Sequence, residues 1–185
     1  MKLAVTNRIS GKKSETKKIR SEGNIPAILY AQGKAKKEII VDGIEFKKIL
    51  NSLDTGMLSS TVFTLTFDNN EVHAILKDVQ YHITTGQVIH LDFQELLEDV
   101  AVTLNIPIKC VNAVDCLGVK LGGVLRQVIR DLKVVCLPKD IPSHFELDVQ
   151  ELSLGKALRL NNIEIPNEVR PIANLKEVAV VVSKR

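Results

Sequence analysis

Short stretches in which apolar and polar residues alternate recur along the chain. In the clearest of them, Phe63, Leu65 and Phe67 alternate with Thr64 and Thr66. Alternation with a period of two is typical of a strand that buries one face and exposes the other. Comparable strand-like runs occur at 25–30, 72–76, 89–93, 100–108, 132–137, 145–149, 157–161 and 178–183. The pattern therefore predicts a mainly β protein.

One segment follows a helical period instead. From Phe46 onward, residues 42–53 carry apolar side chains at the i, i+3, i+4 and i+7 positions of one face. Asp42 is a residue type suited to cap the first turn. We therefore expect an amphipathic helix over 42–53.

A second helix is expected over 14–23, and it is far more polar. Ser14 suits the N-cap and Gly23 suits the position after the last turn. Ile19 is its one apolar residue, among three basic ones. A helix of this kind has little to bury against its own protein, so it is either loosely attached or covered by a charged partner.

The net charge of +3 conceals an uneven distribution. Residues 1–37 hold ten basic and two acidic side chains, which gives a net charge of +8. Residues 38–93 have a net charge of −5, and residues 94–185 are neutral. A block of positive charge at one end of a chain most often serves to bind a polyanion.

Length and composition limit the class of protein. A chain of 185 residues forms one large domain or two small ones, and the acidic stretch 94–100 is a candidate boundary. No apolar run approaches the ~18–20 residues of a membrane helix, and the start lacks the apolar core of a secretory signal. Three cysteines are too few for a disulfide framework, so we expect a cytoplasmic protein.

Recognisable catalytic and metal-binding motifs are missing. The segment SGKKS lacks the first glycine of a phosphate-binding loop, and its serine stands one residue late. Cys110, Cys116 and Cys136 do not have zinc-ligand spacing and are expected as small apolar side chains. We therefore expect a protein that is not an enzyme, with no catalytic residue, no metal and no cofactor.

The basic N-terminal segment is the strongest candidate for a binding site. Lysine and arginine side chains around a short helix are either a solvated surface or a phosphate-binding one. Tyr30 follows this segment and could stack on a base or pack on a ribose. The basic candidates are Arg8, Lys12, Lys13, Lys17 and Arg20.

A second polar set lies within residues 77–93. If Leu91 and its apolar neighbours face the core, then His90 and Asp92 face outward. A carboxylate is unfavourable near phosphate, but it can accept hydrogen bonds from base amino groups. Gln80 and His82 alternate in the same way, although the sequence leaves the hairpin register open. The alternative is a polar, solvent-facing edge.

Several segments together resemble one known family. GKKSETKKIRSEGNIPAILYAQG and DVQYHITTGQVIHLDF resemble the two signatures of the bacterial large-subunit ribosomal protein twenty-five family, whose members bind 5S rRNA. The remainder, from VTLNIPIKCVNAVDCLGVKLGGVLRQ to the final VAVVV, is similar to the extra domain of the longer Ctc, or general stress protein, type. The resemblance covers essentially the whole chain.

This resemblance implies a fold and a partner. The fold would be an N-terminal antiparallel β-barrel with a few helices over 1–94, which binds 5S rRNA, and a β-rich C-terminal domain over 95–185. The family's RNA target is an irregular, non-Watson–Crick internal loop. The implied phosphate contacts are Arg8, Lys12 or Lys13, Lys17 and Arg20. The implied contacts on the RNA helix are Tyr30, Gln80, His82, His90 and Asp92.

Three departures from the family pattern affect these roles. Lys17 stands where arginine is common, which keeps the charge but loses bidentate geometry. Ala31 replaces a usual glycine, and Ile83 replaces a proline after His82.

The sequence therefore predicts a structural component of the large ribosomal subunit that is monomeric off the ribosome. The C-terminal domain would contact neighbouring ribosomal proteins, or RNA through its shape and a few arginines, Arg126, Arg130 and Arg159. A stress-related interaction module that docks on ribosomes and an accessory tRNA-binding protein remain alternatives.

Overall fold

The computed structural model describes residues 1–8, 13–31, 33, 35–54, 56–67 and 70–184. Lys12, one of the candidate phosphate contacts, lies outside the described residues. The chain divides into two compact units, Met1–Val100 and Ala101–Arg185, which we call the N-terminal and C-terminal units.

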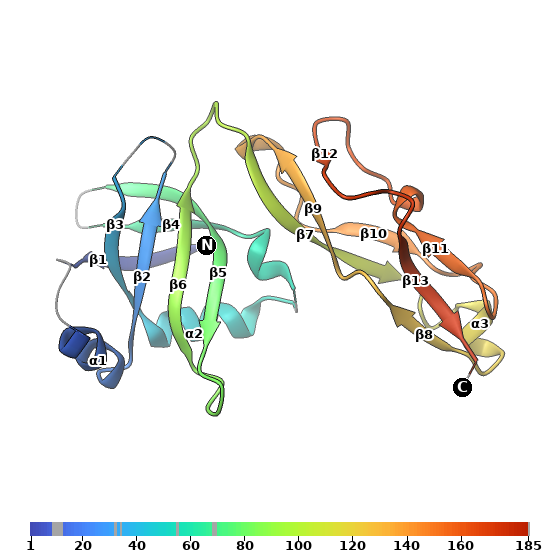
Figure 1. Ribbon diagram of the computed structural model, residues 1–185, viewed down its shortest axis with the longest axis horizontal. Helices are drawn as coiled ribbons and strands as arrows, with labels where there is room; N and C mark the ends of the chain where they lie inside the picture. Colours follow the sequence, from blue (N-terminus) through green and yellow to red (C-terminus); the bar gives the residue numbers. More distant parts are fainter. Residues whose placement is uncertain (9–12, 32, 34, 55, 68–69, 185) are drawn as a thin grey trace. The chain divides into compact units, whose positions relative to one another are not determined.

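The N-terminal unit is a closed barrel with the strand order β1-β3-β2-β6-β5-β4 (Figure 1). The described pairs are antiparallel except for β1 with β4 and β2 with β6, which are parallel. Its strands are β1 (Lys2–Asn7), β2 (Asn24–Tyr30), β3 (Lys37–Asp42), β4 (Val62–Thr66), β5 (Glu71–Tyr81) and β6 (Val88–Glu95). Its helices are α1 (Lys13–Ser21), α2 (Gly43–Ser52) and the short 3₁₀ turn η1 (Met57–Ser59).

The barrel interior is filled by the alternating apolar residues. Phe63 on β4 and Phe93 on β6 meet edge to face, with ring centroids 5.7 Å apart and planes at 75°. Phe46 of α2 is also buried and joins the same core. Aromatic pairs in this geometry contribute beyond the area they bury. These contacts fix which residues of β4 and β6 face inward.

The helix ends agree with the sequence in one case and differ in the other. Asp42 caps α2, because its carboxylate accepts hydrogen bonds from the backbone N–H groups of Ile44 and Glu45 at 2.7 and 3.2 Å. The prediction that Ser14 caps α1 is wrong, since α1 already includes Lys13. Helix starts read from residue type alone shift easily by one position, because several polar residues in a row can serve as caps.

The C-terminal unit contains two sheets, with strand orders β10-β7-β9-β12 and β11-β13-β8. The mainly β fold, a barrel followed by a β-rich region with few helices, is thus as the sequence predicted. The strands are β7 (Val102–Val111), β8 (Val124–Gln127), β9 (Asp131–Cys136), β10 (Phe145–Asp148), β11 (Ala157–Arg159), β12 (Arg170–Pro171) and β13 (Val178–Ser183). The helical turns are α3 (Leu117–Lys120), η2 (Pro138–Asp140) and η3 (Leu160–Asn162).

The three cysteines are free thiols in this unit. Cys116 and Cys136 are buried, and the Cys116 thiol donates to the carbonyl oxygen of Leu152 at 3.3 Å. Among the described helices, none combines the length and the apolar character needed to cross a membrane.

Gly43 gives a test of the barrel's construction. A Cβ atom at Gly43 would overlap the backbone carbonyl oxygen of Gly23, which follows α1. We therefore expect Gly43→Ala to lower the free energy of unfolding by about 1–3 kcal/mol, as overpacking does. Tyrosine fluorescence during urea denaturation reports the N-terminal unit, because the chain has no tryptophan and Tyr30 and Tyr81 are its two tyrosines.

The exposed Lys47→Ala on α2 is the control, with an expected change within about 0.5 kcal/mol. Equal stability of the Gly43→Ala variant and the wild type would contradict the close approach of the two backbones.

Candidate nucleic-acid interface

The outer face of β5 and β6 carries the predicted polar set. Leu91 and Phe93 are fully buried in the barrel, so His90 and Asp92 lie on the opposite, outer face. Gln80 on β5 is paired directly with His90, which settles the register that the sequence left open. Gln80, His90 and Asp92 therefore share one surface.

His90 and Asp92 interact with each other across two positions of β6. The His90 Nδ1 atom lies 2.7 Å from Asp92 Oδ1, although the angles are not those of a hydrogen bond. The His90 side chain is 18% exposed and the Asp92 side chain is 33% exposed, and the His90 Nδ1 atom is inaccessible to solvent. The exposed part of the imidazole therefore excludes Nδ1, and the carboxylate lies beside the ring.

Tyr30 stands at the end of β2, in register with Gln94 of β6. Burial raises the pKa of the Tyr30 hydroxyl above its ordinary value, and the carboxylates of Asp92 and Asp78 raise it further. The Tyr30 hydroxyl is protonated at neutral pH, so it can donate a hydrogen bond. Leu29 pairs with Phe93 and both are buried in the barrel, so Tyr30 faces outward on the same side as Asp92.

Asp78 belongs to this surface and was not among the predicted site residues. It lies two residues before Gln80 and pairs directly with Asp92 of the neighbouring strand. Strand alternation from Gln80 was the signal that could have identified it. The pairing register shifts between Leu76 and Asp78, which changes the alternation of inward and outward residues along β5. Because of this shift, the outer face is hard to follow in the sequence.

Helix α1 presents the predicted cations. Lys13, Lys17 and Arg20 are spaced i, i+4 and i+7, so they share one face of the helix. Together with Ser14 and Thr16 they line a surface hollow of about 480 Å³. All three cationic side chains are exposed, and no residue of α1 is buried. The helix therefore shows a positive face that its own protein does not cover.

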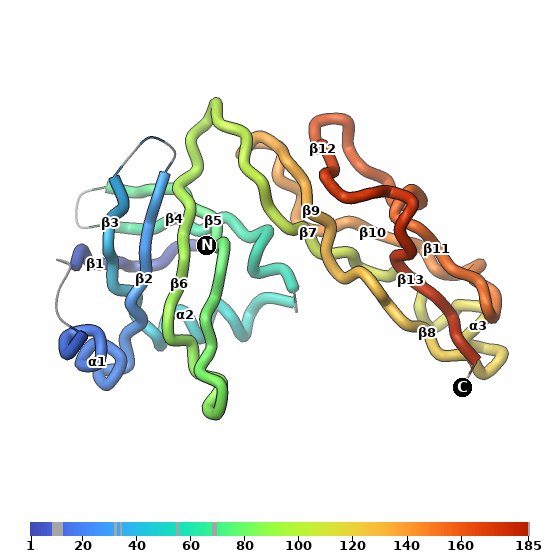
Figure 2. Tube along the Cα trace, viewed as in Figure 1, coloured from blue at the N-terminus to red at the C-terminus, as the bar shows by residue number. Residues whose placement is uncertain are grey.

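A hydrogen bond ties this helix to the strand surface. Arg20 Nε donates to the carbonyl oxygen of Ile89, the residue before His90, at 3.0 Å. Helix α1 lies at the end of the barrel from which the β5–β6 hairpin projects (Figures 1 and 2). The cationic face and the hydrogen-bonding strand face are thus neighbours.

Arg8 is engaged within the protein. Its guanidinium contacts Glu38 Oε2 on β3 at 2.6 Å and donates to Thr16 Oγ1 on α1 at 3.1 Å. The Arg8 side chain is only 16% exposed. Arg8 therefore connects the end of β1 to α1 and β3, and the Glu38 carboxylate offsets its charge.

His82 lies apart from the strand surface, in the turn of the hairpin. Its Nδ1 atom lies 3.1 Å from Thr84 Oγ1 and 3.4 Å from the backbone nitrogen of Thr85. The turn closes with a hydrogen bond from the Gly86 N–H to the carbonyl oxygen of His82 at 2.8 Å. The His82 ring is exposed, but its Nδ1 is occupied by the local turn.

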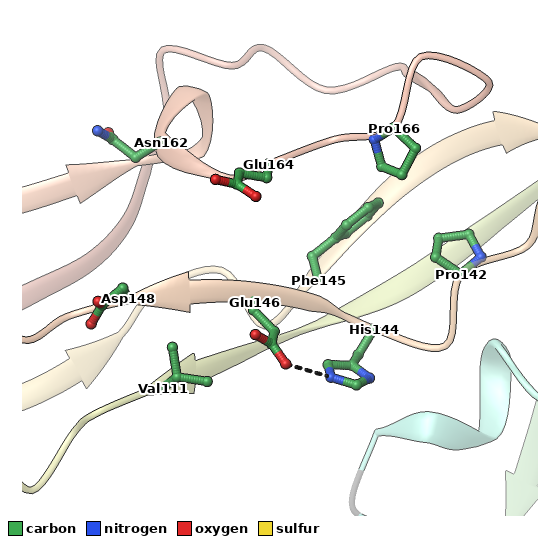
Figure 3. Close-up of a pocket in the computed structure, with 9 residues that line it drawn as sticks. All are labelled: Val111, Pro142, His144, Phe145, Glu146, Asp148, Asn162, Glu164 and Pro166. Carbon is green, nitrogen blue, oxygen red and sulfur yellow. Dashed lines mark hydrogen bonds and ion pairs between the residues drawn. The ribbon is translucent and has the colours of Figure 1, made fainter.

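The C-terminal unit holds a separate groove of about 470 Å³. Figure 3 shows His144 beside Glu146, with Nε2 and Oε1 3.4 Å apart. The groove is lined by Val111, Pro142, His144, Phe145, Glu146, Asp148, Asn162, Glu164 and Pro166. Hydrogen bonds from the Gln150 backbone and the Asn112 side chain lower the pKa of Asp148, so this carboxylate is already satisfied.

Within the described part of the chain, histidine, cysteine and carboxylate side chains form no group of three that could hold a metal ion. The prominent surface combines a cationic helix with hydrogen-bonding side chains on a rigid barrel. This combination is typical of proteins whose surface suits nucleic acid.

Comparison with known proteins identifies the family. Residues 3–93 match the Ribosomal L25p family, and residues 101–185 match the C-terminal domain of ribosomal protein TL5. The chain is 55% identical to the large ribosomal subunit protein bL25 of Chlamydia muridarum, over the full length of both chains. The bL25 proteins of Chlamydia trachomatis serovar D and Chlamydia pneumoniae are each 56% identical, also over their full length. The chain belongs to the ribosomal L25p family, in its longer two-domain form, and is a structural, non-enzymatic ribosomal protein.

The proximity of Tyr30 to the carboxylates can be tested by titration. In a Tyr81→Phe background, we expect the Tyr30 absorbance near 295 nm to titrate above the ordinary pKa of tyrosine. Asp92→Asn should lower that midpoint, because it removes a negative charge that disfavours the tyrosinate. The midpoint should stay above the ordinary value, since burial is the larger cause.

Asp99→Asn, a change at an exposed position after β6, serves as the control and should leave the midpoint in place. A midpoint unaffected by Asp92→Asn would show that the two groups are not close.

Proposed function

We propose that this protein binds 5S rRNA as a component of the large ribosomal subunit in the cytoplasm. The N-terminal unit would carry the RNA-binding surface, within the 1–94 domain expected from the sequence. The names of the relatives, which are large-subunit proteins, and membership of the L25p family support this proposal.

The observation that carries the proposal is the hydrogen bond between Arg20 Nε and the Ile89 carbonyl oxygen, at 3.0 Å. It holds a cationic helix face against the strand that bears His90 and Asp92. RNA offers phosphates and base edges side by side, so a protein that reads a particular RNA needs both kinds of group in fixed relation.

The two faces would have different tasks. Lys13, Lys17 and Arg20 are suited to contact phosphates, which gives affinity without sequence preference. His90 and Gln80 can hydrogen bond to base edges or to 2′-hydroxyl groups, as Asp92 can through its acceptors. A regular RNA helix hides its major-groove edges, so these contacts would favour an irregular loop with an accessible minor groove.

The remaining site residues take secondary roles in this proposal. Tyr30 would donate a hydrogen bond or pack on a ribose at the edge of the surface. His82 would make at most a peripheral contact from the hairpin turn, where Thr84 already occupies Nδ1. Arg8, which is bound to Glu38, would hold α1 in place more than contact phosphate.

The C-terminal unit would provide contacts with neighbouring ribosomal proteins. Residues 94–185 have no excess of basic side chains, which makes them a poor surface for phosphates. We propose that the protein is monomeric when it is off the ribosome.

The phosphate role predicts a change in salt dependence. We expect the full-length protein to bind 5S rRNA in preference to tRNA or a regular duplex, measured by fluorescence anisotropy at several salt concentrations. Lys17→Ala should weaken binding to all three RNAs alike and lower the slope of log K against log salt by about one. Lys48→Ala on α2, an exposed lysine of the same unit, should leave the slope unchanged.

The base-reading role predicts the opposite pattern. His90→Ala and Asp92→Ala should lower the preference for 5S rRNA while leaving the salt slope near its wild-type value, because base contacts carry specificity and phosphate contacts carry affinity. Tighter binding of the wild-type protein to tRNA than to 5S rRNA would refute the proposed partner.

A further inference from the structure

One end of the C-terminal unit exposes apolar side chains around the α3 turn, beside β8 (Figures 1 and 2). Leu117 and Leu121 of this turn are 50% and 74% exposed, and Val124 at the start of β8 is 49% exposed. The partly exposed Leu154 lies against Gly123, which precedes β8, because its Cδ1 atom would be 2.8 Å from a Cβ atom there. We call Leu117, Leu121, Val124 and Leu154 the α3 patch.

Close packing fixes the backbone beneath the α3 patch. A Cβ atom at Gly118 would lie 2.8 Å from Val182 Cγ1, and a Cβ atom at Gly123 would lie 2.6 Å from the same buried side chain. The Gly118 N–H also donates to the carbonyl oxygen of Leu152 at 2.9 Å. The turn therefore has no room to roll inward and bury its leucines. Side chains held outward in this way lose little conformational freedom when a partner covers them.

Arg126 is an unpaired charge beside the α3 patch. It is exposed and lies two residues after Val124 on β8, so both side chains point to the same face of the sheet. Across the sheet Arg126 pairs with Val181 of β13, which pairs in turn with Ala157 of β11. Within the described part of the chain, Arg126 forms no ion pair. A guanidinium in an otherwise apolar row is complementary to a carboxylate on a partner.

The same surface is poorly suited to RNA. Lys120 lies within α3, but it is already paired with Asp115, with Nζ and Oδ1 2.9 Å apart. Affinity for a polyanion comes from several phosphate contacts, whereas Arg126 alone supplies a free cation beside the patch among these described residues. Large apolar side chains exposed together are typical of protein interfaces, in which arginine is also enriched. The chemistry of this surface therefore favours a protein partner.

We propose that the α3 patch and Arg126 form a docking site for another protein of the large ribosomal subunit. The partner presents an apolar surface to the patch and a carboxylate to Arg126. This inference rests on the proposed function, in which the C-terminal unit contacts neighbouring ribosomal proteins, and it names the surface and the chemistry of that contact.

The test measures two affinities of the full-length protein. One is for isolated 5S rRNA, and the other is for large subunits prepared from cells that lack this protein. Leu121→Ser and Arg126→Glu alter the docking site at exposed positions. Ile172→Ser and Arg170→Glu are the matched controls, because they make the same changes at exposed positions at the β12 edge of the other sheet.

The expected result is a loss of affinity for the subunits alone. Leu121→Ser should weaken binding to the depleted subunits about tenfold, because an apolar contact is lost. Arg126→Glu should weaken it by about the same factor, because a carboxylate then faces the partner's carboxylate. Leu121→Met should bind like the wild type, since it keeps an apolar side chain of similar volume. The controls should bind subunits like the wild type, and all variants should bind 5S rRNA like the wild type.

A photo-cross-link identifies what covers the α3 patch. With p-benzoylphenylalanine in place of Leu121, reconstituted subunits should give a cross-link to another ribosomal protein that survives RNase digestion. The yield should exceed that obtained with the same photoreactive residue in place of Ile172. A cross-link to rRNA alone or to a second copy of this chain would overturn the inference, as would equal yields at the two positions.

Failure of the inference can be distinguished from failure of the proposed function. Unchanged subunit binding by either Leu121→Ser or Arg126→Glu would overturn the inference while leaving 5S rRNA binding intact. An equal loss in both assays would also overturn it, because the change would then reach the RNA-binding unit. A wild-type protein with no preference for 5S rRNA over other RNAs would instead refute the proposed function. Thermal denaturation should give the variants the melting temperature of the wild type, since the altered side chains are exposed.

Discussion

The polar outer face of β5 and β6 depends on one constraint, the pairing register between these two strands. Because side chains alternate across a strand, a slip of one residue would turn His90 and Asp92 into the barrel and Leu91 outward. The buried Phe93, packed edge to face against Phe63, makes such a slip very unfavourable. The outward position of His90 and Asp92 is therefore specified by the apolar residues behind them.

Helix α1 is attached by a different kind of interaction. No residue of α1 is buried in the core, and polar contacts connect the helix to the barrel. Arg8 donates hydrogen bonds to Thr16 on α1 and to Glu38 on β3. Arg20 on α1 donates a hydrogen bond to the carbonyl oxygen of Ile89. Such contacts contribute little net free energy each, so they orient the helix more than they bind it tightly. Together the two contacts set the position of the cationic face of α1 beside strand β6.

Much of the fold could be predicted from the sequence, because alternation and a helical period are local signals. The strand at 89–93, the helix capped by Asp42 and the outward direction of His90 are examples. The pairing of Gln80 with His90 could not be predicted, since register depends on residues far apart in the chain. The partners of Arg8 could not be predicted for the same reason, since Glu38 lies thirty residues away in the chain. From its charge alone, Arg8 was expected to contact phosphate.

Asp78 and Asp92, which lie opposite each other on β5 and β6, belong to the acidic excess of residues 38–93. Residues 38–93 carry a net charge of −5, and part of it lies on the outer face of β5 and β6, beside the cationic face of α1. Acceptors on paired strands are held rigidly, so they add discrimination without the entropy loss of ordering a loop.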